Sequence, residues 1–379
     1  MMPIAGPVAH YRITEILMAD EKDKGMTYKD AGVVSVSEEG TFKSLIDWVS
    51  KTMEGRSEIR AEVGLYATVI EVGANLGIAM STDGVGTKIL VAEMMDRFDT
   101  VGIDCVAMNV NDLICVGAKP LAMLDYIAVE DATAPVLGEI GKGLYEGAVM
   151  ADISIPAGEV AQLREMIKGV NPGKGFDLVG TALGTVPLDR MVVGEGIVRG
   201  DVVVGVASSG LHSNGYTLAR KVLLEKFGVD KYMDDLGRTV GEALLEPTTI
   251  YVRPVLEALL KVPEIKAVIH ITGEGFRNLQ RTRSPVEFHL DALPEAPPIF
   301  QLLQKEGKIS NAEMANTYNM GVGLCLVVPE ARAEETAAIF HEHNLEAWTI
   351  GRAGCDDPDR SIHIPSLGVV GKLDKFHKA

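Results

Sequence analysis

Three passages of the sequence share one local pattern, in which a short apolar segment ends at a cluster of small residues and a helical pattern follows. The clusters lie at residues 82–88, 208–215 and 272–275. Glycine lets a backbone turn tightly and lets a ligand approach closely. A loop that opens a helix points N–H groups at an anion near the helix start. The pattern therefore predicts alternating strands and helices, with candidate phosphate sites where the strands end.

The first loop, Thr82-Asp83-Gly84-Val85-Gly86-Thr87-Lys88, carries charge as well as glycine. Asp83 can hold a cation, and Lys88 can face an anion. The loop is not a Walker A sequence and lacks the G-x-G-x-x-G pattern. A ligand loop and an ordinary tight turn with a surface lysine both remain open from the residues alone. The segment 89–95 after it is predicted to be a helix.

A second helix is predicted over residues 101–117, where apolar residues recur at about 100° per residue. Asp104 and Asn111 lie together on its opposite side, and Asp112 lies about a quarter turn further round. Short carboxylate and amide side chains suit Mg²⁺, which prefers oxygen ligands and keeps several waters. The alternative is a solvated polar face of a surface helix.

The second and third loops carry hydrogen-bonding groups. Residues 208–215 contain Ser209, His212, Ser213 and Asn214 within six positions. A histidine there can stabilise phosphate or transfer a proton, because its unperturbed pKa lies near neutrality. The alternative is a cluster that caps the following helix. In the third loop, Thr272-Gly273-Glu274-Gly275, the glutamate would repel a phosphate unless it points away.

Composition limits the class of protein. The chain has 379 residues, which indicates two or three domains, and its formal charge is −17. This charge disfavours a nucleic-acid groove or an anionic membrane surface as partner. Four cysteines form no C-x-x-C pair, so we expect a reducing cytoplasm. Neither a signal peptide nor a membrane-spanning run is visible. We place the domain boundary at residues 187/188, giving domains 1–187 and 188–379.

Six blocks occur in one order along the chain and together resemble the phosphoribosylformylglycinamidine cyclo-ligase (aminoimidazole ribonucleotide synthetase) family. They are Tyr28-Lys29-Asp30-Ala31-Gly32-Val33, Asp83-Gly84-Val85-Gly86-Thr87-Lys88, Gly102-Ile103-Asp104 through Asn111-Asp112-Leu113, Ser208-Ser209-Gly210-Leu211-His212-Ser213-Asn214-Gly215-Tyr216, His270-Ile271-Thr272-Gly273, and Asn316-Thr317-Tyr318-Asn319-Met320-Gly321.

The resemblance implies a two-domain α/β (α+β) fold whose N-terminal sheets form a barrel across a homodimer. It implies ATP-dependent closure of formylglycinamidine ribonucleotide to aminoimidazole ribonucleotide, with ATP and Mg²⁺ as cofactors and phosphorylation of the formyl-amide oxygen. The residues it assigns fall into four sets: Asp83, Asp112 and Glu159 for the metal; Lys29, Lys88, Gly84, Gly86, Thr87, Asp83, Asp104 and Asn111 around the nucleotide; Ser209, His212, Ser213, Asn214, Thr272, Gly273 and Gly275 for the substrate; and Lys29, His212 and Asn214 in catalysis.

Two loops depart from the family pattern. The family carries Gly-Gly-Glu-Thr-Ala-Glu where this chain has Pro156-Ala157-Gly158-Glu159-Val160-Ala161-Gln162, and it has a third glycine where this chain has Glu274. The departures keep two alternatives open. One is another ATP-dependent enzyme of the same superfamily, such as a thiamine-phosphate kinase, and the other is a non-catalytic nucleotide-binding homologue. Asp125, inside an apolar strand, is interpreted as a structural carboxylate and left out of the site.

Overall fold

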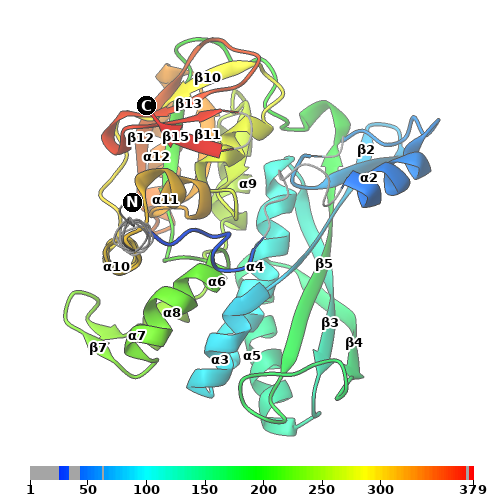
Figure 1. The fold of residues 1–379 in the computed structure, drawn as a ribbon. Coiled ribbons are helices and arrows are strands. Elements are labelled where there is room, and N and C mark those ends of the chain that lie inside the picture. Colours follow the sequence, from blue (N-terminus) through cyan, green and yellow to red (C-terminus); the bar gives the residue numbers. More distant parts are fainter. Residues whose placement is uncertain (1–24, 34–42, 62–63, 373–374) are drawn as a thin grey trace, which may run out of the picture.

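The computed structural model describes residues 25–33, 43–61, 64–372 and 375–379, and its chain forms two large β-sheets, one in each half (Figure 1). The block Tyr28–Val33, called the arm below, lies within the described residues. Val34, which follows it, and Phe42, where the sequence predicts a helix to begin, lie outside them. Among the described residues, no helix is long and apolar enough to cross a membrane.

The N-terminal sheet has five strands in the order β1-β2-β5-β3-β4. All neighbours are antiparallel except β3 and β4, which run parallel. The strands are β1 Thr68–Gly73, β2 Leu76–Gly84, β3 Lys119–Val129, β4 Ser154–Gln162 and β5 Phe176–Pro187. The predicted loop at 156–162 is therefore wrong, because these residues form β4. An edge strand tolerates Pro156, since the missing N–H there needs no partner strand.

Helix α4, Asp99–Cys115, packs on one face of this sheet, and α5, Ala134–Ala151, packs against α4 (Figure 1). The two helices approach closely at Gly102, where a β-carbon would lie 2.3 Å from the backbone nitrogen of Leu144. The short helix α3 spans Ile89–Met95, as predicted, and follows a 3₁₀ turn at Gly86–Lys88. Helix α2, Lys43–Ser50, and a 3₁₀ turn at Lys51–Met53 precede the sheet.

The C-terminal sheet has eight strands in the order β15-β14-β13-β10-β12-β6-β11-β9. Its strands are β6 Val202–Ala207, β9 Ala267–His270, β10 Val286–His289, β11 Val322–Val328, β12 Ala347–Asp356, β13 Ile362–Ile364, β14 Val369–Lys372 and β15 Lys375–Lys378. The chain after Cys355, which was uninformative as sequence, supplies three of them.

Helices and turns surround this sheet. They are α6 Tyr216–Ala219, a π-helical turn Arg220–Leu224, α7 Glu225–Phe227, α8 Val240–Leu244, α9 Val252–Lys261, α10 Pro298–Gly307, α11 Asn311–Thr317 and α12 Ala333–Glu342, with the small hairpin β7 Tyr232–Met233 and β8 Arg238–Thr239 and 3₁₀ turns at Leu188–Arg190, Gly275–Arg281, Glu330–Arg332 and Pro365–Leu367. The continuous helical run 216–227 matches the prediction. Helix α9 begins at Val252, two residues before Pro254, which the first turn of a helix accommodates.

The two halves are joined through a buried ion pair. Lys88 Nζ lies 2.8 Å from Asp104 Oδ2, and neither side chain is exposed. The same ammonium donates to the carbonyls of His212 and Glu246, and Asp104 Oδ1 accepts from the backbone N–H and the hydroxyl of Thr248. Both charged residues belong to the N-terminal half, and all three of their other partners belong to the C-terminal half.

Removing one member of this pair should destabilise the protein strongly, because it leaves the other charge buried without a counter-ion. We expect Lys88→Met to lower the free energy of unfolding by about 3–5 kcal/mol. Thermal unfolding followed by circular dichroism measures the effect. Lys142→Met, which removes a largely exposed partner of Asp99, serves as control and should leave the melting temperature nearly unchanged. Equal melting temperatures for both variants would contradict the prediction.

Candidate functional site

The three small-residue loops meet between the two halves. A β-carbon on Gly273 would lie 2.9 Å from Asn214 Oδ1, so the second and third loops touch. A β-carbon on Gly86 would lie 4.0 Å from the carbonyl oxygen of Ser213, which places the first loop beside the second. Thr87 and Thr217 add a hydroxyl contact of 3.2 Å between the halves. The residues predicted from three distant loops therefore surround one region.

An acidic pair with a histidine lies at the edge of this region. Asp112 on α4 and His270 at the end of β9 interact, with 3.0 Å between Asp112 Oδ1 and His270 Nδ1. Asp83 at the end of β2 is close enough to both for their charges to affect it. Burial, and next the negative charge of Asp112, raise the pKa of Asp83 to about 6. This site is therefore a cluster of two repelling carboxylates with one imidazole beside them.

Asn109 holds Asp83 in position. Its amide oxygen accepts the N–H of Asp83 at 3.0 Å, and its amide nitrogen donates to the carbonyl of Asp83 at 3.1 Å. Gly180 on β5 leaves the space for this amide, since a β-carbon there would lie 2.6 Å from Asn109 Nδ2. Asn109 is completely buried. The sheet and α4 thus fix the backbone of Asp83 before any ligand arrives.

Sequence reasoning missed Asp125 and His270 as members of the site. Register aligns Asp83 with Gly180, Gly180 with Asp125, and Asp125 with Gly158, in one row across four strands. Paired residues share a face, so Asp125 projects on the side of the sheet that carries Asp83. Its carboxylate occupies the place of a side chain at Gly158, 2.3 Å from a β-carbon there. The signal for His270 was its position at the end of a strand, two residues before a small-residue loop.

Glu159 does not join Asp83 and Asp112 within one chain. It follows Gly158 on β4 and pairs with Tyr126, so it lies on the opposite face of the sheet, exposed. Three strand spacings also separate β4 from β2. The structure therefore separates Glu159 from these two carboxylates within one chain, and its metal role stays a prediction. The sequence placed it in a loop, where a side chain can turn to either side, whereas a strand fixes its face.

Lys88, Asp104 and Asn111 are structural in this conformation. The three hydrogens of the Lys88 ammonium have acceptors in Asp104 and two carbonyls, so none is left for a phosphate. Asn111 accepts the N–H of Tyr251 and donates to the carbonyl of Thr249. The expected polar face of the helix is completely buried at Asp104 and Asn111 and joins the halves. The structure gives these side chains partners within the protein, and their predicted contacts with nucleotide or metal stay predictions.

His212 is buried rather than open to a substrate. Burial lowers its pKa well below the usual value, with the charges of His270 and Lys88 as smaller causes, so the ring is neutral at pH 7. Its backbone has φ +62°, and Ser209 donates its N–H to Nε2 at 3.4 Å. This does not support the predicted proton transfer by His212. The ring instead orders the loop that presents Ser213 and Asn214.

The remaining predicted residues lie at the surface of this region or just beneath it. Ser213 and Asn214, Gly84 and Thr87, and Thr272 and Gly273 are partly exposed, Gly86 is exposed, and Gly275 is buried with φ +54°. Ser209 donates its hydroxyl to the carbonyl of Pro247. Lys29 is exposed on the arm, and its neighbour Tyr28 makes a hydrogen bond to the backbone of Gly215.

Glu274, the residue that departs from the family pattern, is turned toward arginines. Its carboxylate lies 3.6 Å from Arg277 Nη1 and 3.4 Å from Arg281 Nη2. The guanidinium of Arg281 also stacks over Tyr66, 4.8 Å from the ring centroid. The two arginines offset the negative charge of Glu274, so the third loop can still accept an anion.

The raised pKa of Asp83 has a consequence for stability. Its folded-state pKa lies above the ordinary value of 3.8, so ionisation destabilises the fold, and this cost is absent below about pH 4 and complete above about pH 6. In the presence of a chelator, Asp83→Asn should therefore raise the free energy of unfolding at pH 8 by on the order of 1 kcal/mol. At pH 4 the substitution should have little effect.

Thermal melts at both pH values, in EDTA, measure this difference. Asp177→Asn is the matched control, because Asp177 Oδ1 accepts the N–H of the next residue at 3.0 Å, as Asp83 Oδ1 does from Gly84 at 2.7 Å. The control should not gain stability at pH 8. A lower melting temperature for Asp83→Asn at pH 8 would show that the carboxylate is not under electrostatic stress.

Solved structures share this fold at low sequence identity. The structure "AaThiL complexed with AMPPCP and TMP" has a TM-score of 0.62 at 19% identity and covers 90% of this chain and 99% of its own. A HypE–HypF complex matches with a TM-score of 0.60 at 18% identity, covering 89% of this chain and all of that chain. T. maritima PurL complexed with AMPPCP has a TM-score of 0.52 at 13% identity, and the match covers 80% of this chain and 45% of that chain. These matches show the fold alone.

Sequence comparisons identify the family. Residues 64–186 match the N-terminal domain, and residues 198–363 the C-terminal domain, of AIR synthase related protein. A phosphoribosylformylglycinamidine cyclo-ligase of Methanocaldococcus jannaschii is 48% identical over 92% of this chain and 96% of that protein. A phosphoribosylformylglycinamidine cyclo-ligase of Methanothermobacter thermautotrophicus is 44% identical over 93% of this chain and 100% of that protein. The resemblance inferred from the six blocks is confirmed: the chain belongs to the AIR synthase related family, among relatives named phosphoribosylformylglycinamidine cyclo-ligase.

Proposed function

We propose that this chain catalyses ATP-dependent ring closure of formylglycinamidine ribonucleotide to aminoimidazole ribonucleotide. The observation that carries the proposal is the meeting of three small-residue loops beside the Asp83–Asp112–His270 cluster, in a chain of this family. The reaction needs two phosphate-bearing substrates held together, and loops from both halves offer sites for both.

The donor set fits a magnesium ion. Asp83 and Asp112 supply carboxylate oxygens, which Mg²⁺ prefers, and a cation bound there would offset both the burial and the charge of Asp112 that raise the pKa of Asp83. A bound Mg²⁺ would neutralise phosphate charge. Asp125, on the same face of the sheet, extends the acidic surface toward β4. We assign Asp83 and Asp112 to the metal and Asp125 to its surroundings.

We assign the contacts with ATP to the first loop and the contacts with the ribonucleotide to the second and third loops. Gly84, Gly86 and Thr87 offer N–H groups or a hydroxyl to the phosphates of ATP. Asn214 and Gly273, which touch, belong to the side that holds the ribonucleotide, together with Ser209, Ser213, Thr272 and Gly275. Lys29 reaches phosphate from the arm. The arm is held at the second loop by a hydrogen bond between Tyr28 and the backbone of Gly215.

The chemistry balances without a covalent enzyme intermediate. The formyl-amide oxygen attacks the γ-phosphorus of ATP and releases ADP. An amidine nitrogen then attacks the formyl carbon that bears the phosphorylated oxygen. That oxygen leaves as phosphate, and loss of a proton gives the imidazole. Phosphoryl transfer of this kind depends mainly on positioning and on neutralisation of charge. Both are what an acidic metal site flanked by N–H-rich loops supplies.

The exposed face of the N-terminal sheet supports a homodimer. Leu124, Tyr126 and Leu183 are exposed there, and their strands place them on the face away from α4. Half-buried Met80 and Ile78 continue this apolar surface on β2. Contiguous exposed apolar surface of this kind marks association sites. We propose that two copies pair through these sheets.

The catalytic proposal predicts coupled formation of ADP and aminoimidazole ribonucleotide by the purified protein with ATP, Mg²⁺ and formylglycinamidine ribonucleotide. Asp112→Asn should reduce kcat at least about 100-fold, because it removes a charge that acts on phosphoryl transfer. Asp177→Asn, on the opposite face of β5, should retain activity. ADP formation without an imidazole product would reject ring closure and favour a kinase of the same superfamily.

The dimer proposal predicts that Leu124→Asp yields a monomer, since a carboxylate in a paired apolar face is costly to bury. Sedimentation velocity of the full chain measures the mass. Leu260→Asp on α9, an equally drastic change at another exposed leucine, should leave the dimer intact. A monomeric mass for the unsubstituted protein would contradict the dimer proposal.

A further inference from the structure

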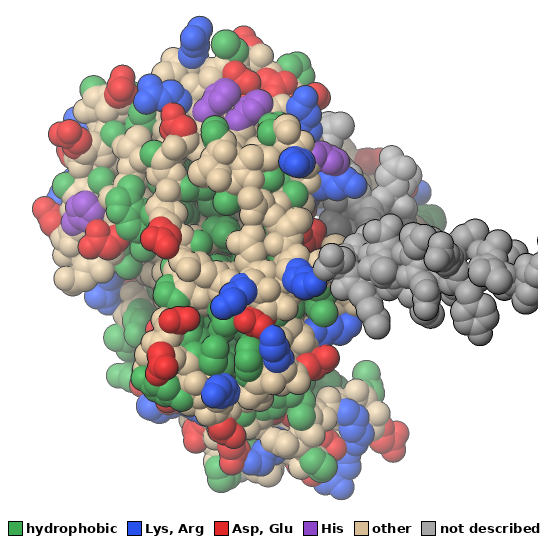
Figure 2. All heavy atoms as spheres, turned by 60° about the vertical axis from the view of Figure 1, so that its left-hand side comes forward, with side chains coloured by type: hydrophobic (Ala, Val, Ile, Leu, Met, Phe, Trp, Pro, Cys, Tyr) green, Lys and Arg blue, Asp and Glu red, His purple; other side chains and the backbone are tan. Residues whose placement is uncertain are grey.

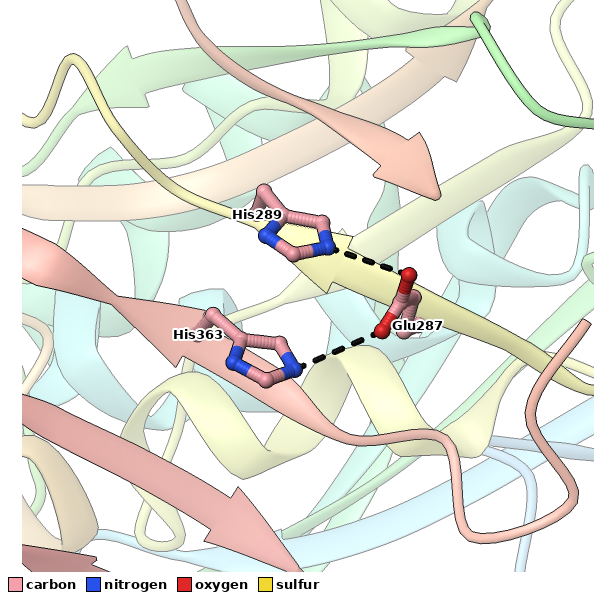
Figure 3. A group of neighbouring side chains, drawn as sticks. All are labelled: Glu287, His289 and His363. Atoms are coloured by element: carbon pink, nitrogen blue, oxygen red, sulfur yellow. Dashed lines mark ion pairs between the residues drawn. The ribbon is translucent and has the colours of Figure 1, made fainter. Parts of the chain in front are cut away.

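A group of three potential metal ligands lies on the C-terminal sheet, apart from the site described above. Glu287 Oε1 lies 3.2 Å from His289 Nε2, and Glu287 Oε2 lies 3.4 Å from His363 Nε2. One ligand atom from each residue can be chosen so that all three lie within 4.8 Å of one another. Figure 3 shows both rings with a nitrogen turned toward the carboxylate. The three side chains are partly exposed.

The sheet itself brings the group together. β10 and β13 run parallel, and their register pairs His289 directly with His363. Glu287 precedes His289 by two positions, so it projects on the same face. The two imidazole rings stack, with centroids 4.5 Å apart and planes inclined by 7°. Backbone hydrogen bonding, not chance contact of flexible side chains, therefore sets the distance between the histidines.

The carboxylate is also held in place. Glu287 Oε1 accepts the N–H of Cys355 at 3.1 Å. Gly354 leaves room for it, because a β-carbon there would lie 2.5 Å from the same oxygen. The group thus presents a carboxylate, positioned by a neighbouring strand, to two imidazoles.

We propose that Glu287, His289 and His363 form a binding site for a divalent transition-metal ion of the Zn²⁺ class. Imidazole with one carboxylate suits Zn²⁺, Ni²⁺ or Cu²⁺, whereas Mg²⁺ prefers oxygen ligands alone. Ligands at 2.0–2.1 Å from a tetrahedral zinc lie roughly 3.4 Å from one another, close to the two oxygen–nitrogen separations seen here. Rotation of the two rings out of their parallel stack would bring one nitrogen of each onto the same ion, and water can complete the coordination.

The site is separate from the proposed catalytic region. Sheet order places β10 and β13 beyond β12 and β6, whereas the second and third loops follow β6 and β9. Figure 2 shows histidine side chains among acidic and basic groups on the upper part of the face that it draws. Glu287, His289 and His363 are each partly exposed, so solvent reaches the group. A metal here would link β10 to β13 and stabilise the outer strands of the sheet.

Zinc binding to the full chain, stripped with chelator and measured by equilibrium dialysis with ZnCl₂ in excess Mg²⁺, tests the site. His363→Ala should lose one equivalent of bound zinc, with affinity for that equivalent weakened at least about 100-fold. His377→Ala is the matched control. His377 pairs with Val370, which pairs with His363, so it lies in the same row of the sheet but outside the group. Zinc stoichiometry equal in parent and His363→Ala would overturn the proposal.

Cobalt spectroscopy separates a built site from loss of folding. Co²⁺ should give the intense visible bands of a tetrahedral centre in the parent and in His377→Ala, and not in His363→Ala or Glu287→Gln. Zinc should raise the melting temperature of the parent and of His377→Ala by several degrees more than that of Glu287→Gln. Absence of both the bands and the difference would show that the group is an ion-pair cluster only. The metal-free melts of all four proteins establish that each is folded.

Discussion

The buried contact between Lys88 and Asp104 fixes how the two halves of this protein meet. A charge pair without solvent is stable only when its other hydrogen-bonding positions are filled. Here carbonyls at residues 212 and 246 and both donors of Thr248 fill them, and all belong to the other half. The pair therefore imposes a geometry as well as a contact. It holds the loop that contains Asp83 beside the loop that contains Ser213 and Asn214.

The same arrangement explains why the acidic cluster can exist. Asp83 and Asp112 repel each other, and the fold must hold them together against that repulsion. Asn109 fixes the backbone of Asp83 with two hydrogen bonds, and α4, which carries both Asn109 and Asp112, is tied across the interface by Asp104 and Asn111. Asp104 and Asn111, which the sequence suggested as support for a metal, thus maintain the spacing of Asp83 and Asp112, whose carboxylates fit a metal ion. The strain is local, and the supporting contacts are spread over both halves.

The sequence predicted local structure well because local patterns carry it. The helix at Ile89–Met95, and a helix that follows the second loop, required only apolar periodicity and glycine placement, whereas the meeting of the three loops is visible only in the structure. The failures all concern partners distant in the chain. Nothing near Lys88 reveals that it is buried, nothing near Glu159 reveals which face of a strand it occupies, and Asp125 joins the site only through strand register. The arginines that offset Glu274 lie within seven residues of it, yet only the 3₁₀ turn Gly275–Arg281 directs them back to it.

Two groups in this protein combine histidine with carboxylate, and their surroundings give them different chemistry. His270 is fully buried and uses Nδ1 to contact Asp112, beside a second carboxylate, Asp83. That group is dominated by oxygen ligands and negative charge, which suits a hard cation and phosphate. Glu287 has two imidazoles and a backbone N–H, so nitrogen dominates and the local charge is smaller. Residue type alone would treat the two groups alike, whereas burial, register and the ratio of oxygen to nitrogen donors distinguish the proposed magnesium site from the proposed zinc site.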